Sequence, residues 1–340
     1  MIFRCFFCLI PILLIGTAPI VAQTRADPVA VQAMKNLHSL DQRLHEIGYK
    51  LATENAPFCN EQTYRSGLLL HDIEQYGDKH TATAVHKFEA PISVNAVAGY
   101  NSRSVFAGDG LISINGKLLS DLDLSDPELE KEQVHYRRLT AINKMIASEL
   151  AHRIPFRNSA STATLLRNGQ EVFRQISPRV SCRSRFEIRP DNKRKAYANG
   201  TVVTISSALA EYVDSDDELA AVVAHELAHN LLKHKDRLNA KKVNRGFFGQ
   251  FGKSAGRIKQ TEIEADRLSV WLMHNAGYNP QAAINFWTRY GKEHGKGIFS
   301  ASTHYRWKKR VKLFEEELVK MATAEAIDGK FAPPLLANKP

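Results

Sequence analysis

Apolar residues recur at three- and four-residue intervals in several stretches of the chain, and this periodicity predicts helices with one buried face. The first stretch is expected to pack on the protein core; its apolar positions are Leu37, Leu40, Leu44, Ile47 and Leu51. Another runs from Leu219 to Leu232, and a third follows Glu262. Further helices are expected to begin at Asn279-Pro280, after a stop at Gly277, and to run from Trp307 to Met321.

Strands and tight turns are predicted between these helices. One strand is expected within residues 66–73, and the β-branched run Thr201–Ile205 predicts another. Gly108–Lys117 has the turn residues of a hairpin, and Thr162–Val172 consists of two strand-like segments joined by an Asn-Gly turn. A helix is expected between them, roughly from His135 to His152.

The helical run Leu219–Leu232 contains the sequence His-Glu-Leu-Ala-His. Residues four apart on a helix share a face, so His225 and His229 can present two imidazoles to one metal ion. Zinc accepts such nitrogens and keeps one position open for water in catalytic sites, and Glu226 is close enough to reach that water. This is the H-E-x-x-H arrangement of zinc peptidases, with two ligands and one general base. A capping box at Ser215–Glu218 starts a helix where the motif requires one; the alternative is a core helix carrying two hydrogen-bonded histidines.

The choice of third ligand decides the type of site. The extended pattern H-E-x-x-H-x-x-G-x-x-H is excluded, because Leu232 and Lys235 occupy its last two positions. Glu262 and Asp266 lie downstream, four residues apart on one predicted helix face. One carboxylate can complete a His2Glu site, while the other accepts the free N–H of a ligating imidazole. Glu264 points elsewhere and is expected to be solvated.

The sequences His-Glu-Leu-Ala-His and Glu-x-Glu-Ala-Asp together resemble the gluzincin family that includes the HtpX heat-shock protease and the CAAX prenyl protease. The likeness extends over about residues 197–313 and includes Asp217–Val222, His234 and Ala276–Pro280. The resemblance implies that Glu262 is the third zinc ligand and that Asp266 is the carboxylate behind a ligating histidine.

Thr303-His304 with Arg310 resembles the late Thr-His-Pro…Arg element of the same family, which is thought to face the substrate or the oxyanion. Tyr305 stands where the family has proline, so an ordinary polar turn is the alternative for His304. The resemblance also implies that the strand Thr201–Ile205 lines the cleft and pairs with extended substrate. Glycines and phenylalanines in Gly246–Gly252 predict a mobile lid near that cleft, or a packed loop.

The middle region carries a second resemblance, to PDZ domains. Pro91–Val94 and Gly108–Lys117 look like the G-D-x-I-x-x-I-N-G hairpin, and the helix and strand pair that follow have the order found in such domains. The resemblance implies an insert that captures substrate by adding an extended peptide to a sheet edge. A purely structural insert is the alternative.

Composition limits the possible partners. The 340 residues are 44% apolar and 24% charged, as in ordinary globular proteins, with a formal charge of +10. Lys and Arg residues are scattered along the sequence, and the sequence contains no recognisable nucleic-acid-binding motif. We therefore expect no nucleic-acid partner, and a solvated basic surface that contacts an anionic envelope or an acidic substrate.

The N-terminus has the pattern of an export signal. Arg4 gives a positive start, Cys5–Ile15 an apolar centre and Ala18–Ala22 a small-residue end, which predicts a signal peptide over residues 1–22. An uncleaved anchor is the alternative, and no transmembrane span is expected after signal removal. A periplasmic or secreted protein is expected to join its two remaining cysteines, Cys59 and Cys182, in a disulfide; two buried thiols are the alternative.

These features predict an α+β protein, consisting of a mainly helical zincin-type metallopeptidase domain with a small sheet and a PDZ-like β-rich insert. The expected divisions are a signal peptide (1–22), an N-terminal helix and strand packing on the peptidase core (23–87), the PDZ-like domain (88–182), the zinc metallopeptidase domain (183–322) and a disordered tail (323–340). Trp287 and Tyr290 are expected in the core. The remaining histidines are expected at the surface; they include His38, His71, His135, His274 and His294.

The predicted function is zinc-dependent endopeptidase activity on polypeptides, including misfolded or envelope proteins. One Zn²⁺ per chain, held by His225, His229 and Glu262, lowers the pKa of its bound water. Glu226 takes the proton as water attacks the scissile carbonyl and passes it to the leaving amine, while the metal and His304 stabilise the oxyanion. The alternatives are a chaperone-like periplasmic binding protein with minor or latent proteolysis, and a zinc enzyme acting on a non-peptide amide.

Overall fold

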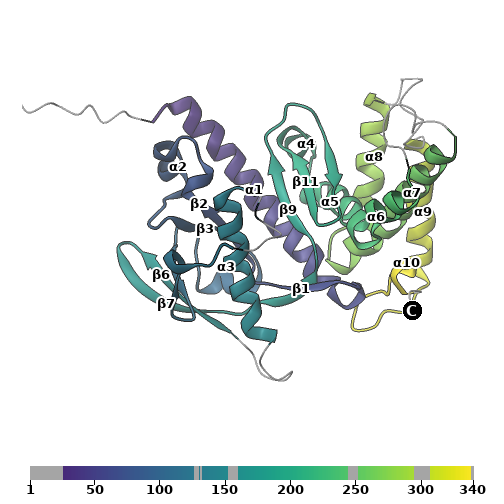
Figure 1. Cartoon of the computed structure of the whole chain (residues 1–340). Coiled ribbons are helices and arrows are strands. Elements are labelled where there is room, and N and C mark those ends of the chain that lie inside the picture. Colours follow the sequence, from purple (N-terminus) through teal and green to yellow (C-terminus); the bar gives the residue numbers. More distant parts are fainter. Residues whose placement is uncertain are drawn as a thin grey trace, which may run out of the picture.

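The computed structural model describes residues 26–125, 130, 132–151, 160–243, 252–294 and 307–337. Buried apolar side chains form two clusters, one beneath a six-stranded sheet and one among the helices that carry the candidate metal ligands. Figure 1 shows the long helix α1 (Pro28–Glu54) running between these two parts of the molecule. The fold is thus a mixture of helices and sheet, as the sequence predicts.

Helix α1 contributes to both parts. It begins at Pro28, where the Asp27 side chain accepts a hydrogen bond from the backbone N–H of Val29 at 3.0 Å. Its predicted apolar face is buried, with at most 1% of the surface exposed at Leu44, Ile47 and Leu51. The expectation that this helix packs on the core is confirmed.

The larger sheet has the strand order β2-β3-β4-β6-β7, with β5 paired to β4. These strands are β2 (Leu68–Asp72), β3 (Ile92–Val97), β4 (Gly110–Ile114), β5 (Lys117–Leu118), β6 (Ser161–Arg167) and β7 (Gln170–Ile176). Both predicted Asn-Gly turns have positive φ at their two residues, the geometry that asparagine and glycine tolerate best: 51° and 76° at Asn115-Gly116, and 52° and 71° at Asn168-Gly169. Helix α3 (Val134–Ala151) packs Ile142 and Ile146 against the sheet. The predicted hairpins, the helix between them and the strand within residues 66–73 are all present.

A smaller sheet supports the candidate metal site. It has the order β10-β11-β9, with β9 (Arg185–Arg189), β10 (Ala196–Ala198) and β11 (Val202–Ser206). The strand predicted at Thr201–Ile205 corresponds to β11. The expectation that it pairs with substrate is wrong, because β10 lies antiparallel on one of its edges and β9 parallel on the other.

Helices complete the second part of the molecule. They are α4 (Ser207–Tyr212), α5 (Asp216–Leu231), α6 (His234–Ala240), α7 (Gly252–Asn275), α8 (Gln281–His294) and α9 (Trp307–Ala322). Gly277 has a φ of +71° directly after α7, as expected of a helix stop, and α8 follows Asn279-Pro280. Helix α2 (Lys79–His86) packs on α1, and short 3₁₀ turns occur at Ala56–Phe58, Ile73–Gln75, Gly99–Arg103 and Leu119–Asp121.

A disulfide lies in the helical part of the molecule, near the end of α1. Cys59 and Cys182 are bonded, with their Cα atoms 5.5 Å apart and a separation of 123 positions in sequence. Strand β1 (Gln62–Arg65) pairs antiparallel with β8 (Arg179–Cys182) beside this bond. The predicted disulfide is therefore present, and it fixes the start of β1 to the strand that leads into the smaller sheet.

The expected disordered tail is wrong for the described residues after 322. Phe331 packs against the core and exchanges two backbone hydrogen bonds with the Asn275 amide, each 2.9 Å long. Lys330 contacts the carboxylate of Glu54, and a short helix, α10 (Pro334–Ala337), follows with Leu336 only 7% exposed. Composition alone did not indicate these contacts, which come from α1 and α7.

The expectation of surface histidines is wrong for His71. Its side chain is 7% exposed, and its Nδ1 lies 2.5 Å from the Tyr76 hydroxyl and also contacts the Asn95 amide. His86 joins the same group, with its Nδ1 2.9 Å from Oδ1 of Asn95. Burial lowers the pKa of both imidazoles, to about 3 for His71 and about 4 for His86, with help from neighbouring histidines.

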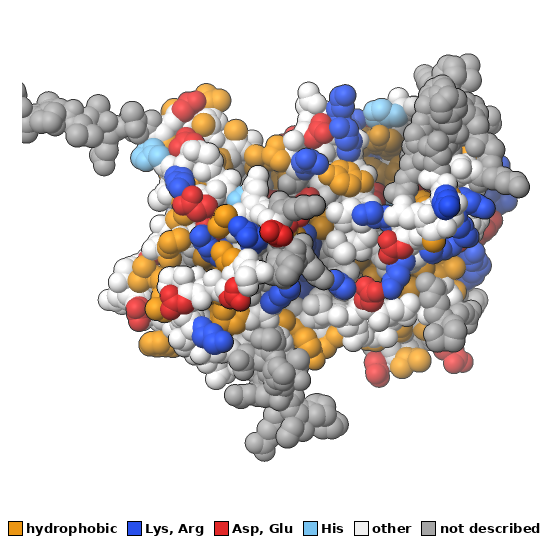
Figure 2. Space-filling model, viewed as in Figure 1, with side chains coloured by type: hydrophobic (Ala, Val, Ile, Leu, Met, Phe, Trp, Pro, Cys, Tyr) orange, Lys and Arg blue, Asp and Glu red, His pale blue; other side chains and the backbone are white. Residues whose placement is uncertain are grey.

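Three sequence predictions lie outside the described residues: the signal at 1–22, the lid residues 246–251 and His304. In the part of the chain that the structure describes, no helix combines the length and apolarity needed to cross a membrane. Figure 2 shows Lys and Arg side chains scattered among acidic and apolar ones on the face in view, without a continuous basic stripe.

Candidate metal centre

Helix α5 presents the two histidines. It begins at Ser215, whose hydroxyl accepts a hydrogen bond from the backbone N–H of Glu218 at 3.2 Å. The carboxylate of Glu218 accepts from the backbone N–H of Asp214 at 2.9 Å rather than from Ser215, so the capping box is only half formed. The apolar side of α5 is fully buried at Leu219, Val223 and Leu227. This packing fixes the side of the helix from which His225 and His229 project.

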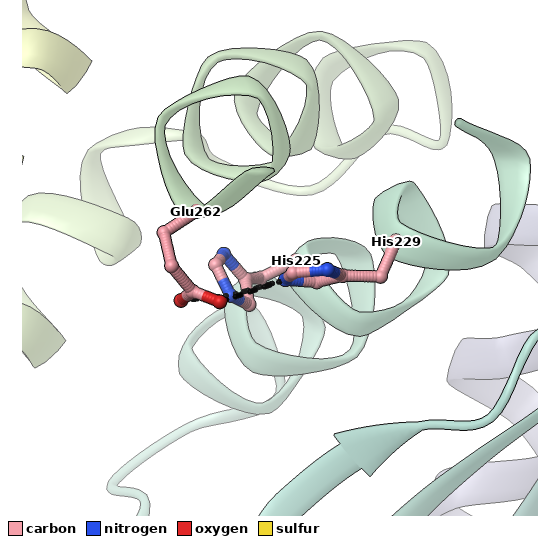
Figure 3. Close-up of side chains that lie close together, drawn as sticks. All are labelled: His225, His229 and Glu262. Atoms are coloured by element: carbon pink, nitrogen blue, oxygen red, sulfur yellow. Dashed lines mark hydrogen bonds and ion pairs between the residues drawn. The ribbon is translucent and has the colours of Figure 1, made fainter. Parts of the chain in front are cut away.

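His225, His229 and Glu262 converge, the last from α7, which packs against α5 (Figure 3). The two Nε2 atoms are 3.2 Å apart, and each lies 3.6 Å from a different oxygen of the Glu262 carboxylate. Within the described ranges, these residues form the one group of three or more His, Cys, Asp or Glu side chains that is close enough to hold a metal ion.

The donor atoms have the spacing that zinc requires. Tetrahedral ligands at the usual zinc distances lie about 3.3 Å from one another, close to the separations found here. Two imidazole nitrogens and one carboxylate also leave a fourth position for water. The three residues therefore fit a catalytic rather than a closed structural zinc site.

Asp266 holds the outer side of His225. Its Oδ1 lies 2.8 Å from Nδ1 of the imidazole, and its carboxylate is fully buried and contacts the guanidinium of Arg310. Burial opposes the charge of Asp266, but Arg310 and His225 outweigh it and lower the pKa of the carboxyl group. Burial likewise opposes the charge of His225, yet Asp266 and Glu262 raise its pKa to about 9. The two carboxylates thus stabilise positive charge on His225, whereas burial and His225 lower the pKa of His229 to about 3.

His229 has a different outer partner. Its Nδ1 lies 2.9 Å from Nδ1 of His234, whose Nε2 lies 3.0 Å from an oxygen of Glu264. Glu264 also forms an ion pair with Arg237. The expectation that Glu264 is solvated is wrong, because α6 folds back on α7 and places His234 and Arg237 beside it.

Of the remaining predicted residues, Glu226 and Arg310 lie in the described part of the chain and His304 does not. Glu226 follows His225 on α5 and is partly exposed, whereas most of the helix is buried. His304 lies outside the described residues, so its contact with an oxyanion stays a prediction. Arg310, part of the same late element, lies at the base of the site with its guanidinium carbon 3.4 Å from the centre of the Trp287 ring.

Two residues at the site were given no role by sequence reasoning. Trp287 packs on the core as expected but also stacks beneath Arg310, and its ring centre is 6.3 Å from that of His225. His234 is 2% exposed. The sequence could have indicated a role for His234 through its position just after the apolar end of the helix that carries the motif, because a histidine there can turn back toward His229.

The sequence around this site matches a known family of peptidases. Residues 184–249 match the model of Peptidase family M48, and the match includes His225, Glu226 and His229 but ends before Glu262. This part of the chain is therefore similar to a Peptidase M48 domain. The comparison does not distinguish the HtpX and CAAX-type members from others, so that finer resemblance stays a prediction.

Curated relatives agree with this class. The mitochondrial metalloendopeptidase OMA1 of Schizosaccharomyces pombe is 30% identical over 140 residues, which cover 35% of this chain and 42% of that protein. The Beta-barrel assembly-enhancing proteases of Yersinia pestis and Escherichia coli O157:H7 are each 30% identical over 119 residues, covering 27% of this chain and 24% of theirs. The chain thus spans less than half the length of these relatives. All three relatives are named as proteases, and the first as a metalloendopeptidase.

Proposed function

We propose that this protein is a zinc-dependent endopeptidase that hydrolyses polypeptides at the site formed by α5 and α7. The observation that carries the proposal is the convergence of His225, His229 and Glu262 at zinc-like spacing, with Glu226 partly exposed on the same helix. Two ligands plus a neighbouring carboxylate on one helix, with a third ligand from a second helix, is the arrangement of a peptidase that activates water.

Each side chain has a role in this proposal. His225, His229 and Glu262 hold one zinc ion, which when bound acts as a Lewis acid toward water and the scissile carbonyl. Glu226 accepts the proton of the attacking water and delivers it to the leaving amine nitrogen. Asp266 accepts the Nδ1–H of His225, which leaves Nε2 as the ligand atom and fixes the orientation of the ring.

The substrate is proposed to lie along β10 rather than β11. Strand β10 packs against α5 and pairs on one side with β11, and among the described residues no strand pairs with its other side. An extended substrate added there is held by main-chain hydrogen bonds, so the site discriminates weakly between sequences.

The substrates are proposed to be misfolded or envelope proteins in an exported setting. The signal-like pattern at residues 1–22 and the disulfide between Cys59 and Cys182 support export. The name Beta-barrel assembly-enhancing protease, borne by two relatives, supports a role near beta-barrel assembly.

The six-stranded sheet is proposed to be a PDZ-like unit that captures polypeptides. Its support is the order of a Gly-Asp strand, an Asn-Gly hairpin, a helix and a second hairpin. At the β2 edge, Arg138 of α3 forms an ion pair with the buried Asp72 at 2.6 Å, which joins the helix to the strand. Strand β7 is the other end of the sheet, and in the described part of the chain neither β2 nor β7 has a strand paired with its outer side. Because α3 is joined to β2, we propose strand addition at β7.

The test of the proposed activity is metal removal and replacement. Casein hydrolysis by the wild-type protein should be lost after treatment with 1,10-phenanthroline and restored by about one equivalent of Zn²⁺ but not by Mg²⁺. Unchanged hydrolysis in the metal-free protein would contradict a zinc peptidase.

A second candidate function is that of a chaperone-like binding protein, favoured by the open edge of β7. It predicts that the protein still suppresses aggregation of a reduced, unfolded client after metal removal, and that cleavage by the wild type is minor or latent. Cleavage that depends on zinc separates the two.

A further inference from the structure

The two histidine ligands are held in different ways on the side that faces away from the metal. Nδ1 of His225 meets a carboxylate directly, at 2.8 Å from Asp266. Nδ1 of His229 instead lies 2.9 Å from Nδ1 of a second histidine, His234. His234 stands between His229 and a carboxylate, because its Nε2 lies 3.0 Å from Glu264.

His229, His234 and Glu264 thus form a series of hydrogen bonds, and the chemistry of the imidazole ring determines where its protons lie. If Nε2 of His229 binds the metal, Nδ1 carries the proton and must donate it. Nδ1 of His234 is then the acceptor, so the single proton of the neutral His234 ring is on Nε2. That proton points at the carboxylate of Glu264, which completes the series without an unsatisfied nitrogen.

The far end of the series is fixed by charge. Arg237 forms an ion pair with both oxygens of Glu264, and the Gln260 amide donates to one of them at 3.2 Å. Both oxygens of Glu264 thus accept hydrogen bonds from groups that can only donate them. Glu264 is therefore an acceptor and not a donor, which fixes the tautomer of His234. His234 itself is buried, with 2% of its surface exposed.

We propose that His234 and Glu264 are positioning residues for the metal ligand His229, acting as a histidine-to-carboxylate relay. The inference rests on the proposed zinc site. Each ligating histidine is then linked to a carboxylate that forms an ion pair with an arginine. His225 is linked directly to Asp266, which pairs with Arg310, and His229 is linked through His234 to Glu264, which pairs with Arg237. The relay holds the His229 ring in one orientation and increases the basicity of the nitrogen that faces the metal.

The expected effect is on metal affinity. Loss of an outer partner of a zinc-bound histidine typically weakens binding by about 10- to 100-fold. His234→Phe keeps a flat ring but removes both nitrogens, so it should show the full effect. Glu264→Gln keeps an acceptor oxygen and loses the charge, so its effect should be smaller. Glu264→Ala should resemble His234→Phe.

The experiment measures the zinc dissociation constant of the full chain by competition with a chromophoric chelator. Co²⁺ absorption spectra of the same variants report the geometry of the ligands. The matched control is Asp236→Asn, which neutralises an exposed carboxylate on the same short helix α6. Thermal midpoints of the metal-free proteins show whether a variant is folded, and the milder Glu264→Gln remains informative if His234→Phe is not.

The relay predicts a graded loss of zinc affinity, from Glu264→Gln to His234→Phe, with an altered Co²⁺ spectrum and a wild-type value for Asp236→Asn. At saturating zinc, kcat should fall while KM for a peptide substrate stays the same. Zinc affinities and spectra of folded His234→Phe and Glu264→Gln that match the wild type would overturn the relay. Failure of the proposed function is a separate result, since it appears as a wild type that does not cleave peptide.

Discussion

The substitution Asp266→Asn tests how the site depends on its most deeply buried charge. Asp266 has no exposed surface, and its carboxylate contacts both Nδ1 of His225 and the guanidinium of Arg310. Asparagine has the same shape and can still accept the imidazole proton through its oxygen. Its NH₂ group, however, presents donors to a guanidinium that also has only donors.

Two effects of different size follow from this geometry. Removing one partner of a buried ion pair costs about 3–5 kcal/mol of folding free energy, because the other charge is left uncompensated. Weakening the outer partner of a zinc-bound histidine reduces metal affinity by about 10- to 100-fold, equivalent to about 1.4–2.7 kcal/mol. Asp266→Asn should therefore lower both the free energy of unfolding in urea and the affinity for zinc.

A second buried carboxylate separates the two effects. Glu317 is 1% exposed and accepts from Arg267 at 2.7 Å and from the Trp271 indole N–H at 2.9 Å, but it touches none of the proposed ligands. Glu317→Gln should lower stability by a comparable amount and leave zinc affinity unchanged. If Asp266→Asn and Glu317→Gln have the same zinc affinity in folded protein, the assignment of Asp266 to the metal site is refuted.

Two further predictions concern the rest of the fold. The pKa of His71 is lowered from 6.5 to about 3, so below pH 6.5 the folded state takes up fewer protons than the unfolded chain. This residue should therefore lower the free energy of unfolding by about 2 kcal/mol between pH 7.5 and 5. His71→Gln should flatten the pH dependence measured by urea unfolding, and an equal slope in both proteins would contradict the prediction. Reduction of the Cys59–Cys182 bond, or its replacement by two serines, removes a link between positions 123 apart in sequence. The free energy of unfolding should fall by about 2–5 kcal/mol. An unchanged thermal midpoint would be the contrary result.

Local sequence rules predicted those parts of the site that lie within single helices. His225 and His229 share a face because they are four residues apart, and the same spacing pairs Glu262 with Asp266. The Asn-Gly turns were equally predictable, since few other dipeptides adopt positive φ at both positions. In each case the information needed was contained in a few neighbouring residues.

The errors arose where partners come from distant parts of the chain. Nothing in the sequence places α6 against α7, so it predicts a solvated Glu264, yet that packing brings Arg237 and His234 to it. The Thr201–Ile205 run predicts a strand, but its position between β10 and β9 depends on long-range pairing. Composition predicts a disordered tail because the contacts of the C-terminal residues with Asn275 and Glu54 span more than 50 positions in sequence.

The measurement that tests the central claim most directly is zinc content together with casein hydrolysis, in the wild type and in Glu226→Gln. Glutamine has nearly the same shape but cannot accept the proton of the attacking water, and it replaces no proposed ligand. We expect about one zinc ion per chain in both proteins, with hydrolysis only in the wild type. Hydrolysis by zinc-loaded Glu226→Gln at the wild-type rate, or a wild type that binds no zinc, would contradict the account.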